Sequence, residues 1–189
     1  VGGGTITPAM AAKVTIASTG DDSAMSFLVS GTNAGLADAD GISTSAAVGN
    51  DAFLDIGGAL AANIPTGGNS GDVTNLIAHK VTISSTGDDS GITFTVVGTD
   101  ALGDPQTEAS ITGANVGTAT STLYFLKITS IEADGDPAGS VSAGISGEIQ
   151  EKVTGANTAT ATTATLFETI TGIKAEGTPA VKVSAGVLG

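Results

Sequence analysis

The side chains in this sequence that are suited to chemistry are few, and most are aspartates in turns. Oxygen-rich loops of this kind can hold Ca²⁺, but none here has the full EF-hand spacing with its closing Glu. Asp and Gly also favour turns for conformational reasons alone. We therefore predict no metal site and keep calcium binding as the alternative for the acidic turns, which are Asp21-Asp22, Asp88-Asp89, Asp38-Ala39-Asp40-Gly41 and Asp134-Gly135-Asp136.

A nucleophilic site has little support in the sequence. The segment Gly68-Asn69-Ser70-Gly71-Asp72 is similar to the nucleophile loop of serine proteases, and the chain has one histidine, His79. A triad also needs an imidazole base that a carboxylate orients, whereas we expect His79 between two strands. The chain has no Cys, and no P-loop, HExxH or dinucleotide fingerprint occurs. We predict no catalytic residue, no cofactor and no enzymatic activity.

Composition narrows the class of protein further. The 189 residues include 19 acids against six Lys and no Arg, which gives a net charge of −13. Nucleic-acid binding is not expected, because affinity for phosphates needs clustered basic residues. The hydrophobic fraction of 40% is mostly small side chains, each of which buries little area. We therefore expect thin cores that are completed by partners, in an oligomer or a lattice.

The chain shows no sign of a membrane or targeting segment in its sequence pattern. No apolar run approaches the length of a membrane helix, and the first residues have neither a basic nor an apolar signal region. The mean hydropathy of +0.30 is too high for a disordered acidic chain. The sequence therefore predicts a folded protein with no membrane association.

Internal repetition is the strongest signal in the sequence. Residues 13–32 (KVTIASTGDDSAMSFLVSGT) recur as residues 80–99 (KVTISSTGDDSGITFTVVGT), at an offset of 67. Residues 112–144 recur as residues 154–186 without a gap, at an offset of 42, and both copies begin TGAN and end VSAG. The chain thus contains two front modules and two back modules.

The order of these modules predicts how the chain is organised. We expect an N-terminal β unit over 1–79 with a divergent second half (33–79), a complete repeat over 80–147, and a C-terminal half repeat over 148–189. The unmatched front (13–32) and the unmatched back (152–186) are expected to complete a second copy of the β unit, within one chain or between neighbouring subunits.

The local pattern favours strands almost everywhere. Ile92, Phe94 and Val96 alternate with threonines, which is typical of a half-buried strand. Thr, Val and Ile favour strands, and Gly-Asp-Asp-Ser is turn chemistry. Residues 51–62 (DAFLDIGGALAA) are the one stretch that suggests a short helix. The sequence predicts an all-β protein of repeated small β-sandwich, Ig-like or barrel-like units with short turns and little helix.

Four phenylalanines recur at equivalent positions of the repeats. Because the chain is so poor in aromatics, we expect them to fill the cores of the units. A carbohydrate-binding platform is the alternative, and the lack of Trp disfavours it. The four are Phe27, Phe94, Phe125 and Phe167.

The run from 80 to 144 resembles repeat units in virion structural proteins of tailed bacteriophages, especially marine ones. The resemblance rests on TGDDSGITFTVVGTD, QTEASITGAN, LYFLKITSIEADG and the closing SVSAG. It extends partly to 13–32 and 152–186 and poorly to 33–79. It brings no catalytic or binding residue with it.

This resemblance implies an all-β, non-enzymatic virion protein, most simply a capsid decoration (cement) protein on the outer surface of the shell. Its partners would be the major capsid protein or other virion subunits, and it would form a symmetric homo-oligomer, with a trimer favoured. A phage tail or fibre component is one alternative. A secreted bacterial surface or filament protein of adhesin type, located extracellularly or at the cell surface, is the other. The sequence leaves open the host, the oligomeric state and the choice among these.

Overall fold

The computed structural model describes residues 13–18, 20–60, 73–157, 159–163, 165, 167–176 and 184–188. Most of these residues lie in antiparallel strands, and the only helical turn among them is η1 (Ala34–Leu36). The all-β prediction is therefore confirmed. The strands are β1 (Lys13–Ala17), β2 (Ser26–Thr32), β3 (Asp38–Ala47), β4 (Val73–Asp88), β5 (Thr93–Thr99), β6 (Pro105–Thr112), β7 (Asn115–Ala133), β8 (Ser140–Thr154), β9 (Thr160–Thr162), β10 (Thr169–Glu176) and β11 (Ser184–Leu188).

The chain divides into two compact units whose boundaries differ from the predicted ranges. Unit 1 consists of Val1–Gly35 and Glu148–Gly189, and unit 2 consists of Leu36–Gly147. The stretch 36–79, which we expected to belong to the N-terminal unit, thus belongs to unit 2. The physical reason is that β3 pairs with β8 over residues 140–145, inside unit 2.

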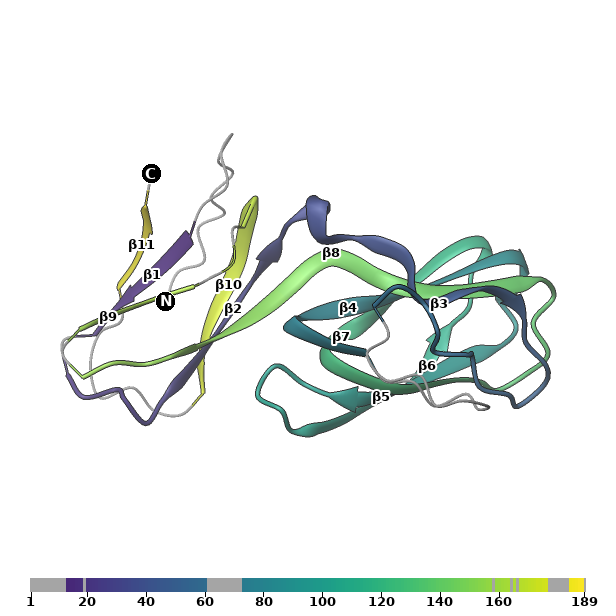
Figure 1. Ribbon diagram of the computed structural model, residues 1–189, viewed down its shortest axis with the longest axis horizontal. Helices are drawn as coiled ribbons and strands as arrows, with labels where there is room; N and C mark the ends of the chain where they lie inside the picture. Colours follow the sequence, from purple (N-terminus) through teal and green to yellow (C-terminus); the bar gives the residue numbers. More distant parts are fainter. Residues whose placement is uncertain are drawn as a thin grey trace. The chain divides into compact units, whose positions relative to one another are not determined.

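Unit 2 is built around the long strand β7. The first part of β7 pairs with β4, its last part pairs with β5, and β5 in turn pairs with β6. β4 also neighbours β8 in the strand order. Figure 1 shows these strands in teal and green around the label of β7.

Unit 1 repeats this plan with strands from both ends of the chain. β1 lies between β9 and β11, and β2 lies between β10 and the last part of β8. Strands of the front copy and of the back copy thus share sheets within one chain (Figure 1).

The registers of the two units match residue for residue. Val96 pairs with Ile131 in unit 2, and Val29 pairs with Ile173 in unit 1. These positions are related by the same offsets, 67 and 42, that relate the sequence repeats. Pairing of β1 with β9 likewise reproduces pairing of β4 with β7. Unit 2 is therefore one copy of the module inserted in the sequence of the other.

The core of unit 2 includes residues that have no counterpart in the repeat. Leu54 and Ile56 are buried with Ile42 of β3 in the same apolar cluster as Phe94 and Phe125. The segment that carries them is extended, since Phe53 forms a bridge with Glu132 of β7. The helix predicted over 51–62 is therefore wrong for residues 51–60, and residues 61–62 lie outside the described part. The backbone of this segment hydrogen-bonds to β7 and takes no helical turn.

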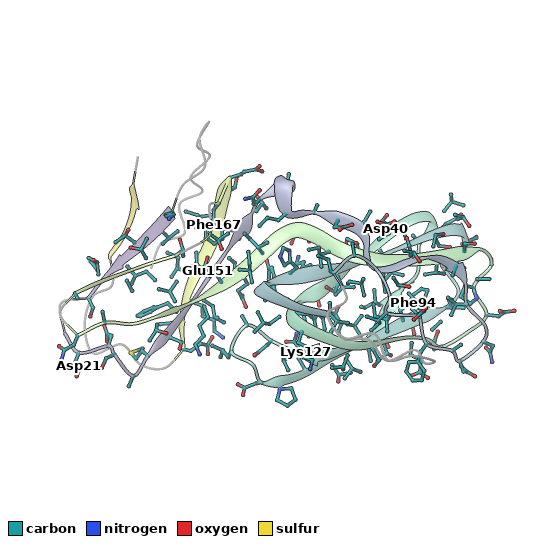
Figure 2. The ribbon with its side chains drawn as sticks, in the orientation of Figure 1. Asp21, Asp40, Phe94, Lys127, Glu151 and Phe167 are labelled. Atoms are coloured by element: carbon teal, nitrogen blue, oxygen red, sulfur yellow. The ribbon has the colours of Figure 1, made fainter. Side chains whose placement is uncertain are left out.

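The four repeated phenylalanines are core residues, as predicted. Phe27 is 1% exposed, and Phe94, Phe125 and Phe167 are completely buried. Figure 2 places Phe94 among the strands of unit 2 and Phe167 among those of unit 1. Rings in these positions cannot form an exposed carbohydrate platform.

Two equivalent glycines, one in each unit, lie where two strands approach too closely for a side chain. A Cβ on Gly98 would collide with the Lys127 carbonyl oxygen, and a Cβ on Gly31 would collide with the Thr169 carbonyl oxygen and the Phe167 ring. The register shifts next to both, at a bulge in β7 and the matching bulge in β10. Glycine permits this approach because it has no Cβ.

Candidate functional site: the paired aspartate turns

Each unit carries one copy of the predicted aspartate turn, between β1 and β2 in unit 1 and between β4 and β5 in unit 2. The first aspartate of each turn is exposed and closes the turn on a serine two residues later. Asp21 Oδ1 accepts hydrogen bonds from Ser23 N (3.1 Å) and Ser23 Oγ (2.6 Å). Asp88 Oδ1 accepts the same two bonds from Ser90 at the same distances. Figure 2 shows Asp21 at the tip of its turn.

These hydrogen bonds stabilise the charged carboxylates. The Ser23 hydroxyl, and after it the Ser23 amide, hold the pKa of Asp21 below its ordinary value. Ser90 lowers the pKa of Asp88 in the same way. Both carboxylates are therefore ionised throughout the neutral range, and they lose these bonds only at acid pH.

The second aspartate of each turn is buried against the TGAN segment of the back module. The Asp89 amide donates to the Ala114 carbonyl (2.9 Å), and the Asp22 amide donates to the Ala156 carbonyl (3.2 Å). A Cβ on Gly113 or Gly155 would collide with the carbonyl oxygen of the neighbouring aspartate. The sequence motifs STGDDS and TGAN, which are far apart in the chain, therefore form one contact in each unit.

Each buried carboxylate has one oxygen in use and one without a described partner. Asp89 is 1% exposed, and its Oδ1 accepts a hydrogen bond from the Ala138 amide (2.7 Å), whereas Oδ2 has no partner. In unit 1, Asp22 Oδ2 accepts a hydrogen bond from the Ser18 hydroxyl, and Oδ1 has no partner. The turns thus join strands and loops within each unit, with spare acceptor capacity.

The described residues do not gather into a metal centre. No group of three or more His, Asp or Glu side chains within the described ranges is arranged to hold an ion. Asp134 instead accepts hydrogen bonds from the amide and hydroxyl of Thr93 at the start of β5, and the hydroxyl is the main cause of its lowered pKa. Asp38 accepts a long hydrogen bond from the Asp40 amide (3.4 Å). Chemically, the aspartates act here as turn and strand connectors.

We expect the two neighbouring aspartates of unit 2 to differ sharply on substitution. Asp89→Ala leaves the Ala138 amide without its acceptor, so it should lower the free energy of unfolding by about 1–3 kcal/mol. Asp88→Ala is the matched control, because it removes only bonds at an exposed turn and should change stability little. Urea unfolding of the two variants measures the difference, and equal losses would contradict the assigned roles.

His79 is a buried structural residue of β4, contrary to its predicted place between two strands. Its side chain is 4% exposed, and Nδ1 lies 3.0 Å from the Ser146 carbonyl oxygen. Because a carbonyl oxygen only accepts, Nδ1 carries the proton and donates. Burial lowers the pKa of His79, and the bond to Ser146 opposes this only in part. The serine-protease-like segment 68–72 lies outside the described residues.

The depressed pKa of His79 predicts a pH dependence of stability. Its folded-state pKa is below the ordinary value of 6.5, so the unfolded chain binds more protons in the interval between the two. Stability should therefore fall as the pH decreases from 6.5 through the folded pKa, by at most about 1.4 kcal/mol per pH unit.

Urea unfolding of the wild type and His79→Gln at pH 7.5 and at decreasing pH tests this. In the variant, the free energy of unfolding should no longer fall with pH between 6.5 and the folded pKa of His79. The variant should keep the acid destabilisation from the aspartates, which begins below their ordinary pKa of 3.8. An unchanged slope in the variant would assign the effect to other groups.

Sequence reasoning missed a second repeated carboxylate. Glu108 of β6 accepts hydrogen bonds from the amides of Thr122 (2.7 Å) and Leu123 (2.8 Å), and Glu151 of β8 accepts one from the Thr165 amide (3.0 Å). The two are equivalent, because Val96 pairs with Glu108 and Val29 pairs with Glu151. A bulge in β6, where Ser110 has a positive φ of 65°, adds one residue and hides the match from a gap-free alignment.

Comparisons with protein-family models, curated proteins and solved structures returned no match. Within the described residues there is also no helix of sufficient length and apolarity to cross a membrane.

Proposed function

We propose that this chain is a non-enzymatic structural protein of a phage virion, and specifically a capsid decoration (cement) protein. The observation that carries the proposal is the nested duplication: one chain presents the same antiparallel module twice, with matching registers. A chain with two similar surfaces can bind two identical subunits of a lattice. After the first surface has bound, the second contact forms at a high effective concentration.

The side-chain chemistry supports the same role. The carboxylates that recur in both units make structural hydrogen bonds to turns and strand ends. The resemblance of residues 80–144 to virion repeat units points in the same direction, and the net charge of −13 disfavours contact with the packaged nucleic acid.

A cement protein works by thermodynamic linkage. It binds the assembled shell across several subunits and does not bind the separated subunits in the same way, so opening of the shell must also break its contacts. Exposed strand edges are suitable contact sites, because main-chain groups pair with a neighbouring strand whatever its side chains.

Incorporation into particles tests the proposal. Purified virions should contain the chain at a fixed ratio to the major capsid protein, and icosahedral reconstruction should place it on the outer shell. Particles that lack the chain should lose shell integrity at lower temperature than particles that carry it. Absence from purified particles would refute the virion role, and a helical array of the chain would replace decoration with a tail or fibre role.

A further inference from the structure

The two units differ at one strand edge, although their modules are equivalent. In unit 2 the outer edge of β7 is occupied by residues 52–54. The Leu54 amide donates to the Ile131 carbonyl (2.9 Å), and the Ala133 amide donates to the Ala52 carbonyl (3.0 Å). This segment adds a strand-like partner that belongs to no repeat.

The equivalent edge in unit 1 is that of β10. Ile173 and Ala175 occupy the positions of Ile131 and Ala133, as their pairing with β2 shows. β10 is the terminal strand in its order, and no strand of the described residues pairs with its other side. An unpaired edge of this kind presents main-chain donors and acceptors to a further strand.

Burial shows that the module of unit 1 is incomplete at this edge. Ile131 and Ala133 are completely buried, whereas Ile173 and Ala175 are only half-buried. In unit 2, Leu54 and Ile56 are fully buried in the same apolar cluster as Ile131 and Ala133. The uncovered apolar surface of unit 1 thus matches a strand with apolar residues at alternate positions.

We propose that the outer edge of β10 is a docking site for an extended segment of a different polypeptide, which adds to the sheet as residues 52–54 do in unit 2. Residues 52–54 of this chain are held by β7 in unit 2 and do not fill this edge, and the donor that we propose is another chain. Its identity as a virion subunit rests on the proposed function, whereas the docking itself does not.

The edge also specifies a charge in its partner. Glu132 is opposite Phe53 in unit 2, and the equivalent residue of β10 is Lys174. Lys174 is well exposed and lies 2.7 Å from Glu176. A cross-strand partner of opposite charge is favourable at such a position and a like charge is unfavourable. At the five positions that correspond to residues 52–56, we therefore expect the docking segment to carry a small residue, an acidic residue, a leucine-like residue, any residue and an isoleucine-like residue, in that order.

Two synthetic peptides test this on the full chain. Both copy residues 50–57, one with Glu and one with Lys in place of Phe53. The Glu peptide should bind more tightly by about two- to five-fold, the range typical of a cross-strand charge pair. Lys174→Glu should reverse this preference without affecting the fold, because the residue is exposed. Amide hydrogen exchange should slow in residues 169–176 when the Glu peptide is added.

The outcomes separate the possible occupants of the edge. Binding of neither peptide, or a preference that Lys174→Glu does not reverse, would overturn the proposal. Slow exchange of the β10 amides in the free chain at all concentrations would assign the edge to the chain itself and also overturn it. Protection that rises with protein concentration alone would replace the foreign donor with a second copy. Failure with the peptides combined with incorporation into particles would leave the proposed function standing.

Discussion

Replacing Phe94 with alanine is expected to lower the free energy of unfolding of unit 2 by about 3–5 kcal/mol. The ring is completely buried in the cluster that contains Phe125, Ile131 and Leu54. The substitution removes the transfer free energy of the ring and leaves a cavity, which strands held by two neighbours cannot close easily. Urea unfolding monitored by circular dichroism measures the loss.

The matched control is Phe53→Ala. Phe53 is 44% exposed and lies in the same unit, so its truncation should cost much less than that of Phe94. A loss for Phe94→Ala below about 1 kcal/mol would mean that the repeated phenylalanines do not carry the core. Similar losses for the two variants would contradict the burial on which the prediction depends.

Replacing Gly98 with alanine is also expected to lower the free energy of unfolding of unit 2. The added methyl group would meet the Lys127 carbonyl oxygen, a backbone atom that β5 and β7 hold in place. Relief requires the two strands to separate at the bulge, and overpacking of this kind costs about 1–3 kcal/mol or more. Gly31→Ala should have the equivalent effect in unit 1, because it meets the Thr169 carbonyl oxygen.

Gly91→Ala provides the control for Gly98→Ala. Gly91 lies in the turn that leads into β5, and a Cβ there would have no atom within 4 Å. Thermal unfolding of the two variants should show a clear decrease for Gly98→Ala and little change for Gly91→Ala. If the two glycines tolerate alanine equally, the close approach of β5 and β7 is not a requirement of the fold.

The sequence predicted the parts of the fold that depend on local pattern and on repetition. Alternation of apolar and threonine residues located β5, and recurrence identified Phe27, Phe94, Phe125 and Phe167 as core residues, because the same environment demands the same side chain. The aspartate turns were also located correctly. Which aspartate of each turn is buried could not be predicted. Adjacent aspartates have the same chemistry, and only the packing of TGAN against the turn decides which one is buried.

The unit boundaries, the conformation of residues 51–60 and the match of Glu108 with Glu151 depended on long-range contacts that no local pattern encodes. Residues 36–60 join unit 2 because β3 and Phe53 pair with strands about eighty to one hundred residues further along the chain. The apolar pattern of 51–62 suited a helix or a strand, and pairing with β7 decided the outcome. The match of Glu108 with Glu151 was hidden by a single-residue bulge.

The strand β8 has a consequence for the order in which the protein folds during synthesis. Its first part completes unit 2 and its last part enters unit 1. Every residue of unit 2 is therefore translated before the C-terminal half of unit 1, whose contacts reach as far as the bond from the Val14 amide to Thr163 (2.9 Å), 149 residues apart. β1 and β2 therefore remain without their C-terminal partner strands while unit 2 forms. Synthesis thus completes unit 2 first, and unit 2 contains the first part of β8, the strand onto which unit 1 then assembles.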